Sequence, residues 1–282
     1  MAESKMPVGV FASAGAGLGA ALEKVLELEV PTAQLHVPGP EERTREHAQE
    51  VAQAFADAGV EVSLVFCGFA GDRYDTIQVV RETVGLVPPD TRAERLEAAR
   101  GMADFAAWLG APGIGIHVGF VSEDWHSPEF AAIVEAVSDL AGHCESLGLT
   151  MNLETGQETA DTLLHLLQTV DRENLRVNFD PANMILYGSG QPMPALRKVS
   201  DYVSSVHCKD AVWSDNPGED FGREVPLGEG DVDISRFIAT LAEIGYEGPL
   251  TIEREVSGQR QIEDIRKGIE LLRRVKADLA IA

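Results

Sequence analysis

"VNFDPANM" (residues 177–184) runs an apolar segment directly into Asp180 and then into a proline. Proline has no backbone N–H, so it cannot continue the ladder of a central strand. An Asp-Pro pair also opens turns, and Asn183 is a residue type that caps the segment after a turn. We therefore predict a buried strand that stops at Asp180 and presents this acid at the end of a sheet.

Short apolar segments of this kind recur along the chain, separated by longer segments with helical spacing. The predicted strands are residues 8–11, 32–37, 62–66, 113–118, 149–154, 175–180, 202–207 and 250–255. The clearest predicted helices are residues 41–59, 92–110 and 128–148, each closing on Gly, which is a frequent helix stop. Strands that alternate with helices pair in parallel, and eight such units close into a (β/α)8 TIM barrel.

The size of the chain fits one barrel. It has 282 residues, 44% of them hydrophobic, and a TIM barrel typically needs about 250 residues. Since no linker or low-complexity run interrupts the pattern, we expect a single domain over residues 1–282. The sequence "GAGLG" (15–19) follows the first predicted strand, but its spacing is not that of a dinucleotide-binding loop, and we expect a strand-to-helix turn there.

Charge and hydropathy exclude several kinds of partner. Lys and Arg total 23 against 46 Asp and Glu, a formal net charge of −23 that repels nucleic acid and anionic membrane surfaces. No apolar run approaches the roughly 18 residues of a membrane helix, and no secretory signal is recognisable. The three cysteines form neither a disulfide framework nor a metal motif. We expect a cytoplasmic protein that binds a small molecule, binds no nucleic acid and no membrane, and is compatible with a homo-oligomer.

Four neighbouring predicted strands end in a group that can bind a metal. These groups are Glu154, Asp180, His207 and Glu253. The carboxyl ends of barrel strands meet at one rim, where three carboxylates repel one another unless a cation lies between them. Oxygen ligands and one imidazole, without a thiolate, favour Mn²⁺, with Co²⁺, Mg²⁺ or Zn²⁺ also compatible. Each acid taken alone could instead cap a helix or form an ion pair.

Five motifs resemble the sugar phosphate isomerase/epimerase group of the xylose isomerase-like barrel superfamily. They are "NLETGQET", "VNFDPANMILYGSG", "VHCKDA", "PLGEGDVD" and "LTIERE", in the family's order between residues 152 and 255. The resemblance implies that Glu154, Asp180, His207 and Glu253 bind one divalent ion. It also implies that Glu154 and Glu253 form the acid/base pair, as in ketose 3-epimerases.

This chemistry has a physical basis. An ion chelated by a substrate carbonyl and the adjacent hydroxyl stabilises a cis-enediolate, while one glutamate removes a proton from carbon and the other returns one. Return from the opposite face gives epimerisation, and return to the neighbouring carbon gives aldose–ketose isomerisation. We therefore predict a metal-dependent isomerase or epimerase of a small sugar or sugar derivative.

Four further residues are candidate substrate ligands: His36, His117, Asn183 and Lys209. The resemblance implies that His117 faces the substrate, and a core or turn histidine is the alternative. Lys209 lies on the same side of its strand as His207, so it could hold a substrate oxygen or phosphate, or be ion-paired. His36 ends the predicted strand 32–37. Trp125 and Trp213 are candidates for packing against a sugar, with core or loop packing as the alternative.

Asn183 marks a departure from the resemblance. Ketose 3-epimerases carry a substrate-contacting histidine there, and an amide cannot carry a proton at neutral pH. A different sugar, a sugar acid or a phosphorylated sugar is therefore open, with Lys209 or Arg223 as candidate anion ligands. The segment 213–228 is expected to shape the pocket. The alternatives are a keto-inositol-type dehydratase and a non-catalytic carbohydrate-binding barrel, whereas the related apurinic endonucleases need histidines that this chain lacks.

Overall fold

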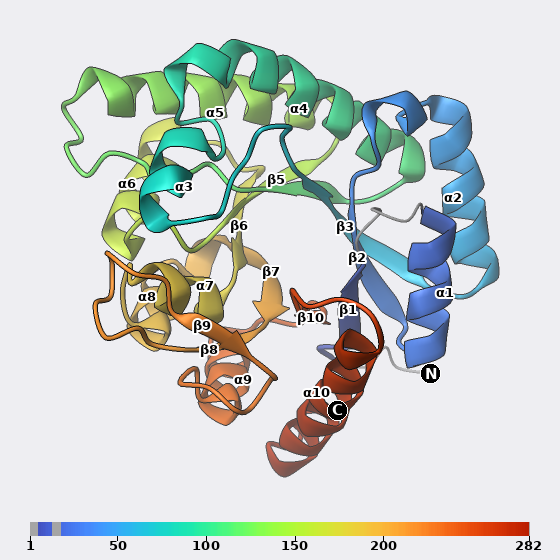
Figure 1. Ribbon diagram of the computed structural model, residues 1–282. Helices are drawn as coiled ribbons and strands as arrows, with labels where there is room; N and C mark the ends of the chain where they lie inside the picture. The colour runs from blue at the N-terminus through green and yellow to red at the C-terminus, as the bar shows by residue number, and fades with distance from the viewer. Residues whose placement is uncertain (1–4, 13–17, 282) are drawn as a thin grey trace.

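Eight parallel strands close into a barrel in the computed structural model, which describes residues 5–12 and 18–281 (Figure 1). Around the barrel the strands follow the order β1, β10, β7, β6, β5, β4, β3, β2. Their bounds are β1 Val8–Ala12, β2 Thr32–His36, β3 Glu61–Cys67, β4 Gly113–Ile116, β5 Thr150–Glu154, β6 Leu175–Phe179, β7 Val203–Cys208 and β10 Leu250–Ile252. The predicted (β/α)8 TIM barrel is confirmed.

Helices lie around the outside of this barrel (Figure 1). They are α1 Leu18–Leu28, α2 Arg45–Asp57, α3 Ile77–Thr83, α4 Pro89–Leu109, α5 Pro128–Ser146, α6 Ala160–Val170, α7 Pro181–Tyr187, α8 Pro192–Lys198, α9 Ile234–Glu243 and α10 Gln259–Asp278. Short 3-10 turns occur at Pro40–Glu42 and Ser200–Tyr202. Hydroxyl caps begin α2, α5 and α6: Thr44, Ser127 and Thr159 each accept a backbone N–H of the first turn.

The ends of several elements differ from the predicted ones. Strands β4, β6 and β10 stop one to three residues before the predicted ends at 118, 180 and 255, and β7 extends to Cys208. The residues after β6 and β10 are charged, Asp180 and Glu253 to Glu255, and lie beyond the last strand residue; strand ends placed from a sequence commonly differ from the observed ends by a few residues. The chemistry-bearing residues His117, Asp180 and Glu253 therefore lie directly after their strands.

A two-stranded antiparallel hairpin follows β7 at the mouth of the barrel. Its strands are β8 Asp210–Val212 and β9 Arg223–Val225, with Val212 opposite Arg223. Asp210 anchors the returning chain because its carboxylate accepts the backbone N–H groups of Gly228, Gly230 and Val232 at 2.9, 3.0 and 3.2 Å. The predicted pocket-shaping segment 213–228 is therefore an anchored hairpin.

Two glycines make room for rings at the barrel mouth. A Cβ on Gly115 would lie 2.4 Å from the ring of Phe66, and a Cβ on Gly68 would lie 2.6 Å from Nε2 of His36. These distances are shorter than any real carbon contact, so glycine is required while the two rings keep their positions.

Three further features concern the cysteines, the helices and the first strand-to-helix turn. The three cysteines are free and buried. Within residues 5–12 and 18–281, no helix is both long enough and apolar enough to cross a membrane. Residues 15–17 of "GAGLG" lie outside the described part of the chain, and α1 begins at Leu18.

Candidate metal and substrate site

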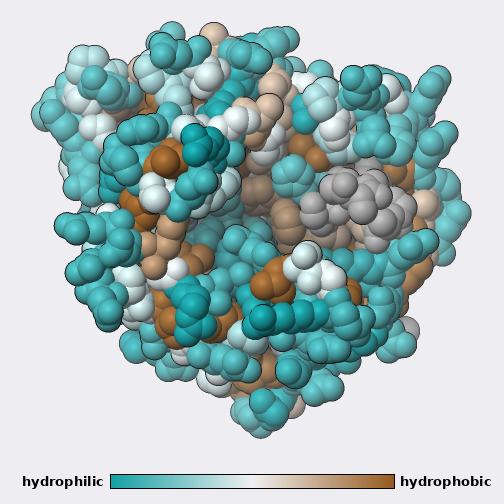
Figure 2. Space-filling model, viewed as in Figure 1, coloured by the Kyte–Doolittle hydropathy of each residue, from teal (hydrophilic) through white to brown (hydrophobic). Residues whose placement is uncertain are grey.

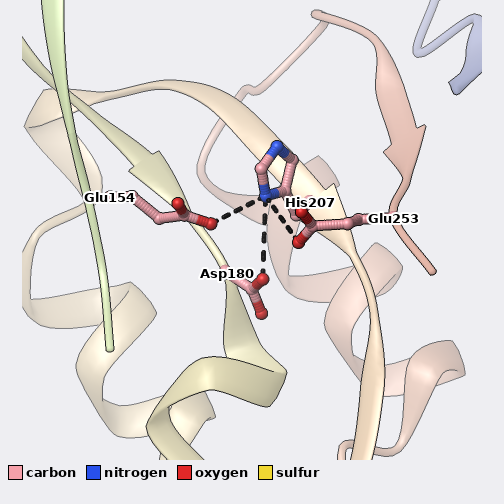
Figure 3. A group of neighbouring side chains, drawn as sticks. All are labelled: Glu154, Asp180, His207 and Glu253. Carbon is pink, nitrogen blue, oxygen red and sulfur yellow. Dashed lines mark hydrogen bonds and ion pairs between the residues drawn. The ribbon is translucent and has the colours of Figure 1, made fainter. Parts of the chain in front are cut away.

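Four side chains from consecutive positions around the barrel meet at its mouth (Figure 3). They are Glu154 at the end of β5, Asp180 after β6, His207 near the end of β7 and Glu253 after β10. One ligand atom from each lies within 4.8 Å of the others. Nδ1 of His207 is at the centre, 2.8 Å from Glu154 Oε1, 3.3 Å from Glu253 Oε2 and 3.6 Å from Asp180 Oδ2.

Asp180 divides its two oxygens between two tasks. Oδ1 accepts the backbone N–H groups of Ala182 and Asn183 at 2.8 and 2.9 Å and so caps α7, whose first residue is Pro181. Oδ2 is fully buried and has no hydrogen-bond partner among the described residues. Its nearest cationic groups are Nδ1 of His207 at 3.6 Å and Nζ of Lys209 at 3.9 Å, both too far for a hydrogen bond, so this oxygen is available to a cation that comes closer.

The ionisation of the cluster follows from burial and from close opposite charges. Burial alone would raise the pKa of Glu154, but His117 and His207 outweigh it and lower this pKa to about 2. Burial raises the pKa of Asp180 to about 6, against the opposing effect of Lys209. The pKa of Glu253 lies well below its ordinary value because Lys209 and His207 outweigh its burial. Protons on His207 and Lys209 thus balance the carboxylate charges in this structure.

A divalent ion fits the same residues. Three carboxylate oxygens and one imidazole nitrogen are donor atoms that hard divalent ions prefer, and four such ligands are enough to bind one ion. An ion would give Oδ2 of Asp180 a close partner, and it would replace the proton on Nδ1 of His207. The structure brings the four predicted ligands together, and their binding of a metal stays a prediction.

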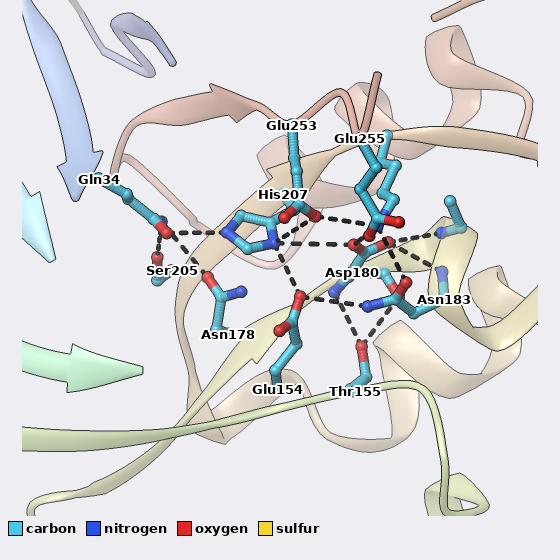
Figure 4. Close-up of polar contacts among 12 residues, drawn as sticks. Gln34, Glu154, Thr155, Asn178, Asp180, Asn183, Ser205, His207, Glu253 and Glu255 are labelled. Atoms are coloured by element: carbon cyan, nitrogen blue, oxygen red, sulfur yellow. Dashed lines mark hydrogen bonds and ion pairs between the residues drawn. The ribbon is translucent and has the colours of Figure 1, made fainter. Parts of the chain in front are cut away.

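His117 and Asn183 both contact Glu154 and both reach the open side of the site. Nε2 of His117 lies 2.8 Å from Glu154 Oε2. The amide of Asn183 donates to Glu154 Oε1 at 3.2 Å (Figure 4). Burial would lower the pKa of His117, but Glu154 outweighs it and raises this pKa to about 9. The carboxylate of Glu154 is thus fixed from both sides and only 2% exposed.

Lys209 is held by carboxylates. Its ammonium lies 3.0 Å from Glu253 Oε2, forms an ion pair with Glu255 and donates to Asn183 Oδ1 at 3.2 Å. The side chain is 1% exposed. Of the two predicted alternatives, a substrate or phosphate ligand and an ion-paired lysine, the geometry favours the second.

A cavity of about 500 Å³ opens above this cluster. Figure 2 shows the molecule hollowed at the centre of the view, with hydrophobic residues along part of the rim. The cavity wall combines aromatic rings with polar groups of the site. It includes Phe11, His36, Phe66, Phe69, Tyr74, His117, Asn183, Tyr187, Phe221 and Glu253. His36, His117 and Asn183 thus face the cavity as predicted substrate ligands should, although their binding of substrate stays a prediction.

Several acidic side chains line the cavity beside His36 and His117. Asp72, Glu224 and Glu255 are among its lining residues, and the described lining residues include no Lys or Arg. Two of these acids are paired outside the cavity, Asp72 with Arg95 at 3.0 Å and Glu224 with Arg254 at 2.9 Å. On the described wall a bound anion would therefore meet no lysine or arginine, and the imidazole of His117 is already paired with Glu154.

Three residues singled out in the sequence do not line the cavity. Trp125 is 43% exposed and stacks on His165 with ring centroids 3.9 Å apart. Trp213 packs against the hydrophobic core. Arg223 is exposed on β9. Trp125 thus packs in an exposed loop and Trp213 packs against the core, which are the two alternatives to packing against a sugar.

Sequence reasoning missed several residues of the site. Gln34 contacts His207 from β2, on the far side of the barrel, and Glu255 pairs with Lys209. Tyr74 and Tyr187 lie on the cavity wall. A glutamine in the middle of an apolar strand, two residues before His36, is the one signal that could have identified Gln34.

Comparison with known proteins agrees with this architecture. A family model described as "Xylose isomerase-like TIM barrel" matches residues 22–275. A crystal structure of a xylose isomerase domain protein from Planctomyces limnophilus is 48% identical, with a TM-score of 0.95 over 99% of this chain and 100% of that one. The uncharacterised protein MJ1311 of Methanocaldococcus jannaschii is 25% identical over 219 residues, which are 72% of this chain and 71% of MJ1311.

More distant structures share the fold. L-ribulose 3-epimerase superposes with a TM-score of 0.72 at 17% identity, over 98% of both chains. A xylose isomerase-like TIM barrel protein from Mycobacterium smegmatis, solved in complex with magnesium, gives 0.73 at 20% identity over 98% of both chains. The structural neighbours thus include sugar epimerases and a magnesium complex.

Proposed function

The chain belongs to the xylose isomerase-like TIM barrel family, and we propose that it is a divalent-metal-dependent isomerase or epimerase of a small sugar or sugar derivative. One observation carries the proposal. Three carboxylates and a histidine converge within 4.8 Å beneath an aromatic-walled cavity, and one buried carboxylate oxygen, Oδ2 of Asp180, accepts no hydrogen bond from the described residues. Sugar epimerases among the structural neighbours support the reaction class.

Glu154, Asp180, His207 and Glu253 would hold the ion. When bound, a divalent ion polarises a substrate carbonyl and stabilises the negative charge that develops on its oxygen, so an adjacent carbon loses a proton more easily. A hard ion, Mn²⁺ or Mg²⁺, suits the donor set best, and magnesium in the M. smegmatis structure supports this choice.

Glu253 and Glu154 differ in their access to substrate. Glu253 lines the cavity, and its side chain is 14% exposed, so it can take a proton from a bound sugar directly. Glu154 is 2% exposed and lies against His117, which does line the cavity. We therefore assign Glu253 as the base on one face of the bound sugar. Glu154 together with His117 is assigned as the proton donor on the opposite face.

The substrate that fits this cavity is uncharged. Aromatic rings offer apolar faces to a sugar ring, whereas the acids at the rim and the pairing of Lys209 disfavour a phosphate. Backbone N–H groups after β7 often bind phosphate in TIM barrels. Here Asp210 already occupies those of Gly228, Gly230 and Val232. A role in carbohydrate metabolism in the cytoplasm stays part of the proposal.

The decisive experiment is metal analysis of the purified protein, combined with C–H exchange in deuterated water. We expect one divalent ion per chain and deuterium incorporation into a neutral ketose, drawn from a panel of ketoses, sugar phosphates and keto-inositols. Loss of water from a keto-inositol would instead indicate a dehydratase. A protein that binds no divalent ion and exchanges no substrate proton would refute the proposal.

A further inference from the structure

A glutamine on the opposite side of the barrel contacts the rear nitrogen of the central histidine. Oε1 of Gln34 lies 2.8 Å from Nε2 of His207, while Nδ1 of His207 faces the three carboxylates (Figure 4). Gln34 is 1% exposed and His207 is fully buried. Since water does not reach this contact, the carbonyl of the glutamine favours a proton on Nε2 of His207, whatever the state of Nδ1.

Two acceptors hold the amide in one orientation. Nε2 of Gln34 donates to Ser205 Oγ at 2.8 Å and lies 3.4 Å from Asn178 Oδ1. These contacts use both N–H bonds of the amide, so its carbonyl is left for His207. If the amide were reversed, its NH2 would face Nε2 of His207 and drive the proton onto Nδ1, where it would block a metal.

The ring of His207 is also prevented from turning over. Phe11 and Phe66 pack against it, each with ring centroids 5.5 Å away. Phe66 keeps its place because Gly115 has no side chain there. A rotation that exchanged the two nitrogens would need both phenylalanines to move.

From these contacts we propose that Gln34 is the positioning residue of the metal site. It accepts the Nε2 proton of His207 and so leaves the Nδ1 lone pair directed at the ion. This inference rests on the metal binding of the proposed function, but it does not depend on the substrate or the reaction. An uncharged acceptor adds no fourth negative charge next to Glu154, Asp180 and Glu253, unlike the carboxylate that often supports a metal-binding histidine.

The test compares three variants of the full-length protein in Mn²⁺ titrations. Gln34→Leu removes the acceptor. Gln34→Glu keeps an acceptor, and its charge is met when the amide of Asn178 turns over, because Oδ1 of Asn178 now faces Gln34 and its Nδ2 makes no hydrogen bond. Asn152→Leu is the matched control, because Asn152 is an equally buried amide on β5 that bonds Ile114 O and Ser204 instead of a ligand. We expect Gln34→Leu to raise the Kd for Mn²⁺ by about 10- to 100-fold, and the other two to stay within about fivefold of the parent.

Nitrogen-15 NMR of the histidine rings gives a readout that a purely structural role would not produce. In the parent protein, Nε2 of His207 should carry a proton both without metal and with Mg²⁺, and its signal is assigned by its loss in His207→Gln. Equal losses of affinity in Gln34→Leu and Asn152→Leu, or a parent ring protonated on Nδ1 alone, would overturn the proposal. If the parent protein binds no ion, the proposed function is refuted, while the NMR result still decides whether Gln34 accepts the Nε2 proton of His207.

Discussion

At the scale of single residues, Asp180 explains why the strand at 175–179 ends where it does. Its Oδ1 caps α7 and its Oδ2 is left for an ion, so one side chain terminates β6, starts the next helix and contributes to the site. The structure shows the capping role of this carboxylate, and its role as a metal ligand stays a prediction.

Substitutions of Asp180 should separate these two tasks. Asparagine keeps an oxygen for the cap but loses the second carboxylate oxygen, whereas alanine loses both. We expect both variants to weaken Mn²⁺ binding by at least tenfold, and Asp180→Asn to be more stable than Asp180→Ala by about 1 kcal/mol without metal. Urea unfolding and metal titration measure the two effects. Equal stability of the variants would show that the cap contributes nothing.

Glu253 is expected to be the more accessible base. Glu253→Gln should lower the rate of substrate C–H exchange by about 10²- to 10⁴-fold at saturating metal, because an amide cannot accept the proton. Glu270→Gln, an exposed change on α10, serves as the control and should leave the rate unchanged. Exchange at the parental rate in Glu253→Gln would remove this residue from the mechanism.

Glu158 should make stability depend on pH. It is 7% exposed, it lines a second cavity beside Arg81 and Glu123, and burial raises its pKa to about 8 from the ordinary 4.5. Between these values the folded state holds a proton that the unfolded state has lost, so the free energy of unfolding falls as pH rises.

Glu158→Gln should remove this dependence. We expect the variant to match the parent near pH 4 and to exceed its stability by at least about 1 kcal/mol at pH 9, since the cost of burying a charged carboxylate is removed. Glu123→Gln, an exposed neighbour in the same cavity, should shift stability by no more than about 0.5 kcal/mol at any pH. A pH-independent difference for Glu158→Gln would contradict the raised pKa.

At the scale of elements, the hairpin β8–β9 is tied to the strand end that carries Glu253. Arg254 pairs with Glu224 of β9 and with Asp264 of α10, each at 2.9 Å, and is 5% exposed. Glu224 also accepts the backbone N–H of Glu255. Arg254, a buried residue next to Glu253, therefore connects the hairpin that forms part of the cavity wall to the end of β10.

Removing this arginine should loosen the hairpin. We expect Arg254→Met to lower the free energy of unfolding by about 3–5 kcal/mol, because the carboxylates of Glu224 and Asp264 lose the buried guanidinium between them, and to speed amide exchange in β8 and β9. Arg266→Met breaks a half-exposed pair with Glu27 and should cost about 0–1 kcal/mol. Urea unfolding and hydrogen exchange distinguish the two. Similar small losses in both variants would show that the buried pair does not hold the hairpin.

The elements also show which features a sequence can predict. Alternating apolar and amphipathic segments predict the barrel, and the position of an acid or histidine at a strand end predicts that Glu154, Asp180, His207 and Glu253 meet, since parallel strands end at one rim. The contact of Gln34 with His207 crosses the barrel and depends on strand tilt and register, which no local pattern encodes. The pairing of Lys209 with Glu255 likewise depends on how the chain turns after β10.

At the scale of the whole molecule, the net charge of −23 and the acid-lined mouth act together on an approaching substrate. Surface charges repel an anion over about one Debye length, roughly 8 Å at physiological ionic strength. Within the described cavity wall there is no Lys or Arg to reverse that repulsion, and Lys209 is buried between Glu253 and Glu255. Neutral sugars escape this effect.

Salt should therefore distinguish neutral from phosphorylated substrates. For a neutral ketose we expect kcat/KM to change less than twofold between low and physiological ionic strength. For its phosphate ester we expect a value at least tenfold lower that rises with added salt, because screening reduces repulsion. The neutral sugar, measured with the same enzyme preparation, is the internal control. A phosphate ester that reacts faster, and loses that advantage as salt is added, would show that a cationic subsite outweighs the acidic surface and would reverse the assignment of substrate class.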